Sequence, residues 1–264
     1  MLKEKELSQI DYRKIEALSS SDIRTLLSNP YLFSIKYEKQ ATETMKLGSA
    51  IHSLLIEPDN FNRDFLVMPE LNLRTKEGRE TKAKLELENK DKTLLSNDLY
   101  IQATNCVNVI KESEFNNFFK NGYGERSYFG EIDGVKCKCR PDYIVTDRGR
   151  AFIVDLKTTG FGGANPNEFS RKVANMGYYI QAAFYLELIE DIKNFFFLVI
   201  ETEPPYMIGL YDLDSVSLDY GREQIKKALN IYKNIDNIKN VYVDKISNET
   251  LQTLTLPNYV FYNN

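Results

Sequence analysis

Cysteine is scarce in this chain, which has 264 residues and only three of them, Cys106, Cys137 and Cys139. An odd and sparse count argues against a disulfide framework and fits a reducing compartment. The pair Cys137-x-Cys139 would need further ligands to hold zinc or an iron–sulfur cluster. The remaining cysteine falls in an expected helix, and the single histidine is far away in the sequence. We therefore expect Cys137 and Cys139 to be structural residues of a strand.

Long apolar runs are also missing. No stretch approaches the roughly 20 residues that a membrane-spanning helix needs, and the longest run, residues 195–200, has the length of a strand. The first nine residues, MLKEKELSQ, are charged and contain no signal-peptide core. These features predict an intracellular, cytoplasmic protein with no membrane partner.

No strong excess of one charge is present. The net charge is −4, with 42% hydrophobic and 27% charged residues, which is ordinary for a globular protein. This balance does not point to a nucleic-acid partner. It does not exclude one either, because metal-binding carboxylates lower the total while a local basic groove can still bind DNA.

The spacing of apolar residues predicts a helical N-terminal part followed by a β-rich centre. Helices are expected over 19–29, 45–57, 97–120, 167–190 and 215–234, and strands over 124–131, 135–140, 143–146, 151–157, 194–201 and 206–212. The highly charged stretch 70–92 predicts an exposed helix or a mobile arm. Together these elements predict an α/β (α+β) fold with a central mixed β-sheet flanked by helices. A single domain, 1–264, is expected to comprise a mainly helical part (1–120), a β core (121–215) and a C-terminal helix and tail (216–264).

The most informative pattern is Arg140-Pro141-Asp142 followed, after twelve intervening residues, by Asp155-Leu156-Lys157. The apolar residues 151–154 indicate a buried strand that leads into the second motif. Because side chains alternate along a strand, Asp155 and Lys157 point to one side while Leu156 points into a core. Two acids and a lysine that converge in this way indicate a site for a divalent cation and an activated water. A surface ion pair of little energetic value is the alternative.

A hairpin adds a third carboxylate. Asp133-Gly134 is a strong turn signal, and with Ile132 opposite Val135 the numbers of paired residues sum to 267. Glu125 then lies across from Asp142, so that Glu125, Asp142 and Asp155 converge at one end of the sheet. Carboxylates this close require a shared proton or a cation, and Mg²⁺ prefers such oxygen ligands. A β-bulge would shift the register and invalidate this prediction.

Two further features bear on this site. The only histidine, His52, borders the apolar stripe of the expected helix 45–57, either as a core residue or as a ligand. Gln181 and Tyr185 are four residues apart and therefore share one helix face. Both side chains can bond a phosphate or a ligand, and a polar packing pair is the alternative.

In combination, these residues resemble the PD-(D/E)XK nuclease superfamily, in particular its RecB-like branch and the RecE (exonuclease VIII) family of phages and prophages. The matching pieces occur in the family's order: Gly48-x-x-x-His52, Glu125, Arg140-Pro141-Asp142, Asp155-Leu156-Lys157 and Gln181-x-x-x-Tyr185. The segments LSSSDIRTLLSNPYLF and RTKEGRE are also similar to that family. The resemblance covers most of the chain except about its last forty residues.

The resemblance implies roles for these residues. The metal ligands would be Asp142, Asp155, His52, Glu125 (directly or through water) and the backbone carbonyl of Leu156. Lys157 would orient or deprotonate the attacking water, and Gln181 and Tyr185 would position the motif residues and the scissile phosphate. Asp142, Asp155, Lys157, Glu125, Gln181 and Tyr185 are thus the expected catalytic set.

The resemblance also implies an activity. It is the Mg²⁺-dependent 5′→3′ degradation of linear double-stranded DNA with free ends, with Mn²⁺ as an expected substitute for Mg²⁺. The resulting 3′ overhang would feed a single-strand annealing protein during recombination in a bacterial host. A ring-like homotetramer is expected from the same resemblance. An endonuclease of the superfamily and a non-catalytic DNA-binding protein are the alternative functions.

Two basic groups are candidates for DNA contact. One is Arg171 with Lys172, just before the Gln181 segment; the other comprises Arg74, Lys76, Arg79, Lys82 and Lys84. A solvated charged face is the alternative for both. Tyr178 and Tyr179 are candidates for stacking on bases or for the core.

Overall fold

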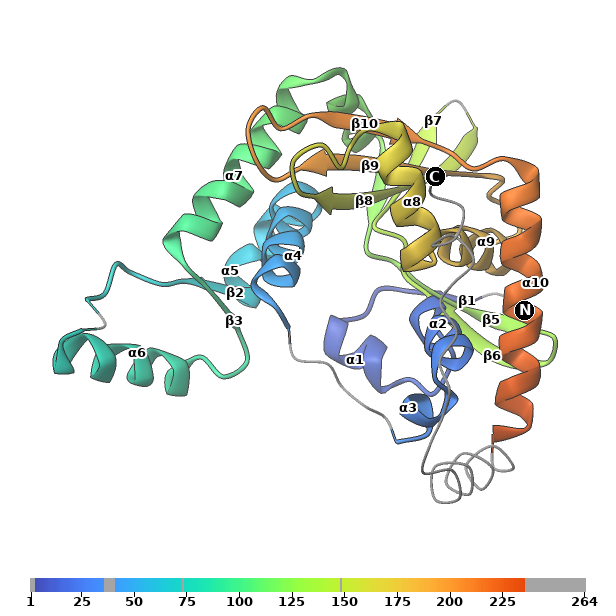
Figure 1. Cartoon of the computed structure of the whole chain (residues 1–264), viewed down its shortest axis with the longest axis horizontal. Coiled ribbons are helices and arrows are strands. Elements are labelled where there is room, and N and C mark those ends of the chain that lie inside the picture. The colour runs from blue at the N-terminus through green and yellow to red at the C-terminus, as the bar shows by residue number, and fades with distance from the viewer. Residues whose placement is uncertain (1–2, 36–40, 73, 148, 236–264) are drawn as a thin grey trace, which may run out of the picture.

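The central feature of the fold is a mixed five-stranded sheet, covered by helices on both faces (Figure 1). A computed structural model describes residues 3–35, 41–72, 74–147 and 149–235. The strand order is β10-β9-β8-β7-β4. The strands are β4 (Gly122–Gly124), β7 (Tyr143–Asp147), β8 (Arg150–Thr159), β9 (Asn194–Glu201) and β10 (Ile208–Tyr211). Strands β8 and β9 pair in parallel and the other neighbours are antiparallel. The predicted α/β fold with a mixed central sheet is confirmed.

Two helical layers enclose this sheet because its central strands are apolar on both faces. On one face α4 and α7 pack against Val154 and Leu156 of β8. On the other face α8 and α9 share a core with Ile153, and α10 and α2 pack against α9. The helices are α2 (Ser20–Ser28), α4 (Glu43–Ile56), α7 (Asn97–Glu112), α8 (Pro166–Met176), α9 (Tyr178–Leu188) and α10 (Ser215–Lys233).

A second, three-stranded sheet has the order β1-β5-β6 and packs on α9. It is made of β1 (Lys3–Lys5), β5 (Ser127–Ile132) and β6 (Val135–Cys139). In the β5–β6 hairpin Ile132 pairs with Val135, and the numbers of paired residues sum to 267 as predicted. The same sum holds where β4 pairs with β7. The segment that contains β4 and β5 therefore pairs with the segment that contains β6 and β7 in one register across both sheets.

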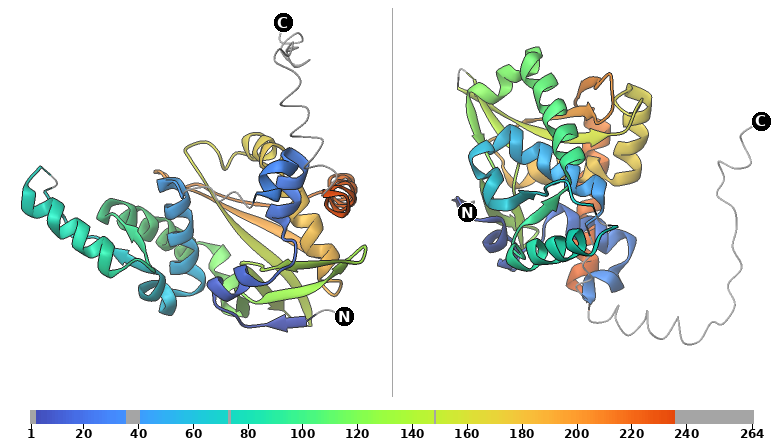
Figure 2. Two further views of the ribbon diagram at one scale, coloured as in Figure 1. Left: turned by 90° about the horizontal axis from the view of Figure 1, so that it is seen from below. Right: turned by 90° about the vertical axis from the view of Figure 1, so that its left-hand side faces the viewer.

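A charged arm extends from the main body (Figures 1 and 2). It consists of helix α6 (Lys76–Glu88) beside the two-stranded parallel sheet β2 (Phe65–Val67) and β3 (Thr93–Leu95). Gly78 is the only buried residue of α6, so the exposed-helix prediction for this stretch is confirmed. The remaining short elements are α1 (Gln9–Lys14), α3 (Pro30–Ser34), α5 (Phe61–Asp64), η1 (Pro58–Asn60) and η2 (Glu114–Lys120).

Several element boundaries differ from the predictions, and three of them affect the site. Segment 167–190 is two helices, because Gly177 adopts a left-handed conformation, with a φ of 64°, between α8 and α9. Segment 124–131 is interrupted at Glu125, whose φ is 55°, so that β4 and β5 belong to different sheets. Strand β8 extends to Thr159, which places Asp155 and Lys157 inside the strand instead of at its end.

Other sequence predictions concern single residues and segments. Cys106, Cys137 and Cys139 are free and buried, and the last two lie on β6 as expected for structural cysteines. None of the helices in the described part of the chain has the length and hydrophobicity needed to cross a membrane. The portion of the expected C-terminal tail beyond residue 235 lies outside the described residues.

Candidate active site

The site lies on an edge of β8 that has no strand partner. The ladder between β7 and β8 ends at the pair Tyr143–Val154, whereas β8 continues for five more residues. Side chains replace the missing strand there. Asp142 Oδ2 accepts the backbone N–H of Leu156 at 2.8 Å, and His52 Nε2 lies 2.9 Å from the Leu156 carbonyl oxygen. The end of β7 thus brings Asp142 directly beside the motif on β8.

Helix α4 supplies His52 to this edge. The helix begins at a Thr42 cap and packs its apolar stripe of Leu47, Ile51 and Leu55 against the sheet. Gly48, one turn before His52, faces Thr158, since a Cβ there would lie 3.3 Å from the Thr158 hydroxyl. The sequence Gly48-x-x-x-His52 therefore allows α4 to approach β8 closely.

The hairpin register brings Glu125 to the same place. The Glu125 N–H bonds the Asp142 carbonyl oxygen at 3.2 Å, as the predicted pairing requires. Ligand atoms of His52, Glu125 and Asp142 all lie within 4.8 Å of one another. Burial, and secondarily the Asp142 carboxylate, raise the pKa of Glu125 to about 8. Without a cation, Glu125 therefore holds a proton at neutral pH.

Asp155 and Lys157 lie on the opposite side of β8 from Leu156, toward α8 and α9. Asp155 Oδ2 and Lys157 Nζ are 2.5 Å apart, and the two side chains are only 1% and 14% exposed. This burial excludes a surface ion pair. Burial raises the pKa of Asp155. Burial alone would lower the pKa of Lys157, but the Asp155 and Asp142 carboxylates outweigh that effect and raise it.

Gln181 links these two charged residues from α9. Its amide nitrogen donates to Asp155 Oδ1 at 2.7 Å, and its amide oxygen accepts from Lys157 Nζ at 3.1 Å. The ring of Tyr178 lies under the same ammonium, 4.6 Å from its centroid. The Gln181 amide therefore fixes the orientation of both motif side chains.

Tyr185, one turn further along α9, contacts the Arg140-Pro141-Asp142 motif. Its hydroxyl donates to the Arg140 carbonyl at 3.3 Å, next to Pro141 and Asp142. Gln181 and Tyr185 thus lie on one helix face, as predicted, and each contacts a different motif.

Arg140 has a role that the sequence did not indicate. Its guanidinium donates to the Glu125 carbonyl at 2.7 Å and lies 3.2 Å from the Glu125 carboxylate. The same group bonds Gln9 and the Leu7 carbonyl. Arg140 therefore anchors Glu125 and the segment before α1. The available signal was a basic residue two positions before Asp142.

The donor set fits a hard divalent cation. Because a carbonyl only accepts, His52 Nε2 carries a hydrogen, and Nδ1 of the same ring lies 3.4 Å from Asp142 Oδ2. Asp155 Oδ2 is buried, and the Lys157 ammonium lies 2.5 Å from it. A carboxyl that retains its proton beside a second carboxylate is relieved by a cation. Two carboxylates and one imidazole with a nearby backbone carbonyl suit Mg²⁺ or Mn²⁺.

The predicted convergence of three carboxylates is only partly observed. Glu125 and Asp142 meet together with His52, while Asp155 is outside that group and faces the other helical layer. Asp155 still acts on this group through its charge, which contributes to the raised pKa of Glu125. The basic residues of α6 lie on the distant arm, where Lys76, Lys82 and Lys84 pair with glutamates four residues away. That face is a solvated charged helix surface.

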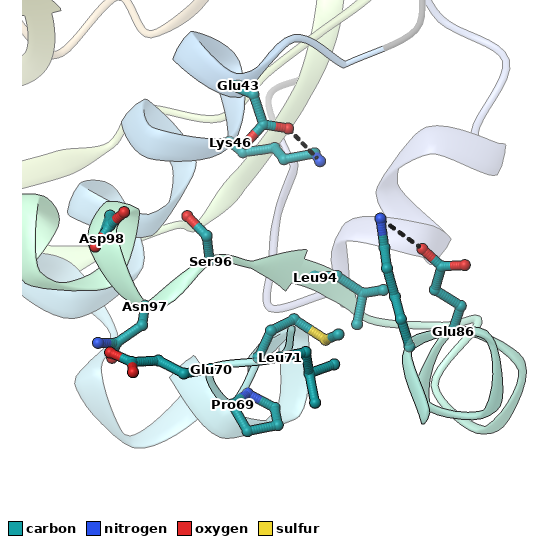
Figure 3. Close-up of a pocket in the computed structure, with 12 residues that line it drawn as sticks. Glu43, Lys46, Pro69, Glu70, Leu71, Glu86, Leu94, Ser96, Asn97 and Asp98 are labelled. Atoms are coloured by element: carbon teal, nitrogen blue, oxygen red, sulfur yellow. Dashed lines mark hydrogen bonds and ion pairs between the residues drawn. The ribbon is translucent and has the colours of Figure 1, made fainter. Parts of the chain in front are cut away.

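A cavity in the described part of the chain lies away from this site. Its volume is about 520 Å³, and it lies between the charged arm and the start of α4 (Figure 3). Its lining combines apolar residues such as Leu71 and Leu94 with the ion pair Lys46–Glu43. Glu43 precedes His52 by nine residues on α4, or about 13 Å along the helix axis. This cavity contains none of the candidate site residues.

The sheet order, the two motifs and the helical clamp define a core of the PD-(D/E)XK nuclease type. Comparison with protein families agrees: this chain belongs to the family described as PDDEXK-like domain of unknown function (DUF3799), which matches residues 31–245. The predicted superfamily is therefore confirmed. No curated protein matches the chain significantly.

A solved structure shows the same fold. The crystal structure of a candidate exonuclease from Eubacterium rectale is similar, with a TM-score of 0.63 and 15% identity, over 96% of this chain and 97% of that one. The alkaline exonuclease LHK-Exo from Laribacter hongkongensis matches with a TM-score of 0.35 and 11% identity, over 89% of this chain and 99% of that one. At 15% identity, the similarity to the Eubacterium rectale structure shows the fold alone.

Proposed function

We propose that this protein is a divalent-metal-dependent DNA exonuclease. The observation that carries this proposal is the open edge of β8, where His52, Glu125 and Asp142 meet beside the buried Asp155–Lys157 pair. The name of the similar Eubacterium rectale protein, a candidate exonuclease, supports the same class of reaction.

The proposed cofactor is Mg²⁺, with Mn²⁺ as a substitute. His52, Glu125, Asp142, Asp155 and the Leu156 carbonyl are the groups that would hold it. With a divalent cation held by these residues, the pKa of a coordinated water would be lowered and charge on the phosphate oxygens would be neutralised. The raised pKa of Glu125 supports this assignment. Its carboxyl retains a proton beside the Asp142 carboxylate, and a bound cation would favour the ionised form.

Lys157 is proposed to orient the attacking water and to stabilise the phosphate. Its pKa is raised by neighbouring carboxylates, so the ammonium keeps its proton at neutral pH and acts as a donor. Gln181 holds this ammonium and Asp155 in place. Tyr185 positions the backbone that carries Asp142. These residues preorganise the site before DNA binds.

The finer proposals follow the resemblance to the RecE family. They are a preference for linear double-stranded DNA with free ends, digestion in the 5′→3′ direction, and a 3′ overhang that a single-strand annealing protein uses. A ring-like homotetramer, a phage or prophage origin and action in the bacterial cytoplasm belong to the same proposal.

The test compares linear duplex labelled separately at its 5′ and 3′ ends with closed circular duplex, each with Mg²⁺ or with a chelator. We expect Mg²⁺-dependent release of the 5′ label from linear DNA and no loss of circles. Asp155→Asn should reduce the rate at least about 100-fold, whereas Asp147→Asn, an exposed aspartate at the far end of β7, should not.

The outcomes separate the alternatives. Cleavage of closed circles would replace the exonuclease by an endonuclease. DNA binding without any cleavage under Mg²⁺ or Mn²⁺ would instead indicate a non-catalytic DNA-binding protein. Full activity of Asp155→Asn would refute the site assignment.

A further inference from the structure

The open edge of β8 continues past the candidate active site. In a strand, the N–H and C=O groups of alternate residues point to the same side. Leu156 bonds Asp142 and His52 on the open side, so the backbone groups of Thr158 point to that side as well. Lys172 Nζ donates to the Thr158 carbonyl at 2.8 Å. A third side chain, that of Lys172, therefore reaches this edge at Thr158, two residues beyond the Leu156 carbonyl that is proposed to bind the metal.

Lys172 comes from α8 and is an unusual lysine. It is partly buried, and no acidic side chain among the described residues pairs with it. Its one hydrogen bond goes to a neutral carbonyl. Burial lowers the pKa of Lys172, and the nearby Lys157 ammonium lowers it further. Two ammonium groups thus lie near one another, and only Lys157 has a carboxylate partner.

The neighbouring residue provides a contrast. Arg171 is exposed and pairs with Glu168 at 2.5 Å on the outer face of the same helix. Its charge is already compensated and solvated, so it contributes little to a specific site. An anion at Lys172 would instead compensate a partly desolvated charge and reduce its repulsion with Lys157.

The separation suits a nucleic-acid strand. Two residues along a β-strand span about 6.6 Å, which is of the same order as the step between successive phosphates of one DNA strand. We propose that Lys172, with the outward-facing backbone N–H of Thr158, binds the phosphate next to the scissile phosphate. This inference rests on the proposed nuclease function, which it extends by a second phosphate subsite.

The experiment measures binding of a linear duplex to the full chain in the presence of a chelator, between 50 and 200 mM salt. Lys172→Gln should weaken binding roughly tenfold at low salt, as for the loss of a charge-assisted hydrogen bond. The salt slope should decrease by about 0.9, the value for one lost phosphate contact on duplex DNA. Lys172→Arg should retain the slope, and Arg171→Gln is the charge-matched control with little expected effect.

Activity supplies a second readout. With Mg²⁺, Lys172→Gln should raise KM for DNA roughly tenfold and leave kcat within a few-fold, because Lys172 binds a phosphate that does not react. Thermal unfolding checks each variant. If Lys172→Gln does not fold, Lys172→Met keeps the aliphatic part of the side chain and takes its place.

Two results would overturn the inference. The first is that the parent chain digests DNA while Lys172→Gln and Arg171→Gln show the same DNA affinity and the same salt slope. This result would reject the phosphate subsite and leave the proposed nuclease function intact. The second is a parent chain that neither binds nor digests DNA, which rejects the proposed function as well.

Discussion

The exchange of Gln181 for methionine tests how strongly the site depends on its helical clamp. Methionine has nearly the same length and volume as glutamine, so Gln181→Met preserves packing in this buried position. It removes the donor to Asp155 and the acceptor for Lys157. Asp155 and Lys157 then keep their mutual ion pair and the Tyr178 ring under the ammonium.

The structure gives a magnitude for this change. A hydrogen bond to a charged group contributes about 1.5–3 kcal/mol, and Asp155 is almost completely buried. Because the two bonds share one network, their losses do not add fully, and we expect about 2–4 kcal/mol in the free energy of unfolding. For a chain of this size that corresponds to a decrease in Tm of roughly 4–16 °C. A misoriented motif should also lower kcat about 10- to 100-fold with little change in KM.

The assay combines thermal unfolding without metal with digestion of linear duplex under Mg²⁺. Tyr185→Phe is the comparison, since it removes a single longer bond to a neutral carbonyl and should cost about 1 kcal/mol. A Gln181→Met protein with parental Tm and kcat would refute the clamp, and equal effects of both variants would show that the charged network has no special role.

Three further predictions concern the metal-binding side of the site. The folded-state pKa of Glu125 is raised from 4.5 to about 8, so metal-free protein should lose stability as pH rises from about 5 to 8 and remain constant above that. Glu125→Gln should abolish this slope in denaturant titrations, and saturating Mg²⁺ should oppose it in the parent chain. His52→Asn should raise the Mg²⁺ concentration for half-maximal activity about 10-fold or more, and an unchanged value would make His52 a packing residue. Arg140→Met should destabilise the protein by about 2–3 kcal/mol in melting experiments, since it removes the donor to the Glu125 and Leu7 carbonyls and to Gln9.

The local patterns in the sequence predicted much of the sheet and its register. The two-residue turn at Asp133-Gly134 fixes the pairing of the whole hairpin, so Glu125 could be placed opposite Asp142 from numbering alone. Alternation along one buried strand placed Asp155 and Lys157 together. Both predictions work because they depend on a period of two and on short sequence separations.

The parts that could not be predicted depend on distant contacts or special backbone conformations. The left-handed conformation of Glu125 transfers the chain from one sheet to the other, and no residue-type signal marks it. Gly177 divides a continuous helical pattern because it adopts a left-handed conformation at the end of α8, where the distant Arg24 donates to the Met176 carbonyl. Likewise, the bond from Lys172 to Thr158 joins two elements whose approach only the tertiary structure reveals.

The unpaired edge of β8 has a consequence for solubility. An exposed strand edge with free backbone groups is a template for pairing with another chain and therefore for aggregation. Here Asp142, His52 and Lys172 occupy those backbone groups. Residues proposed to act on DNA thus also protect the fold from edge-to-edge association. Substitutions that remove these side chains should increase self-association at high concentration, so loss of function and loss of colloidal stability would arise at the same positions.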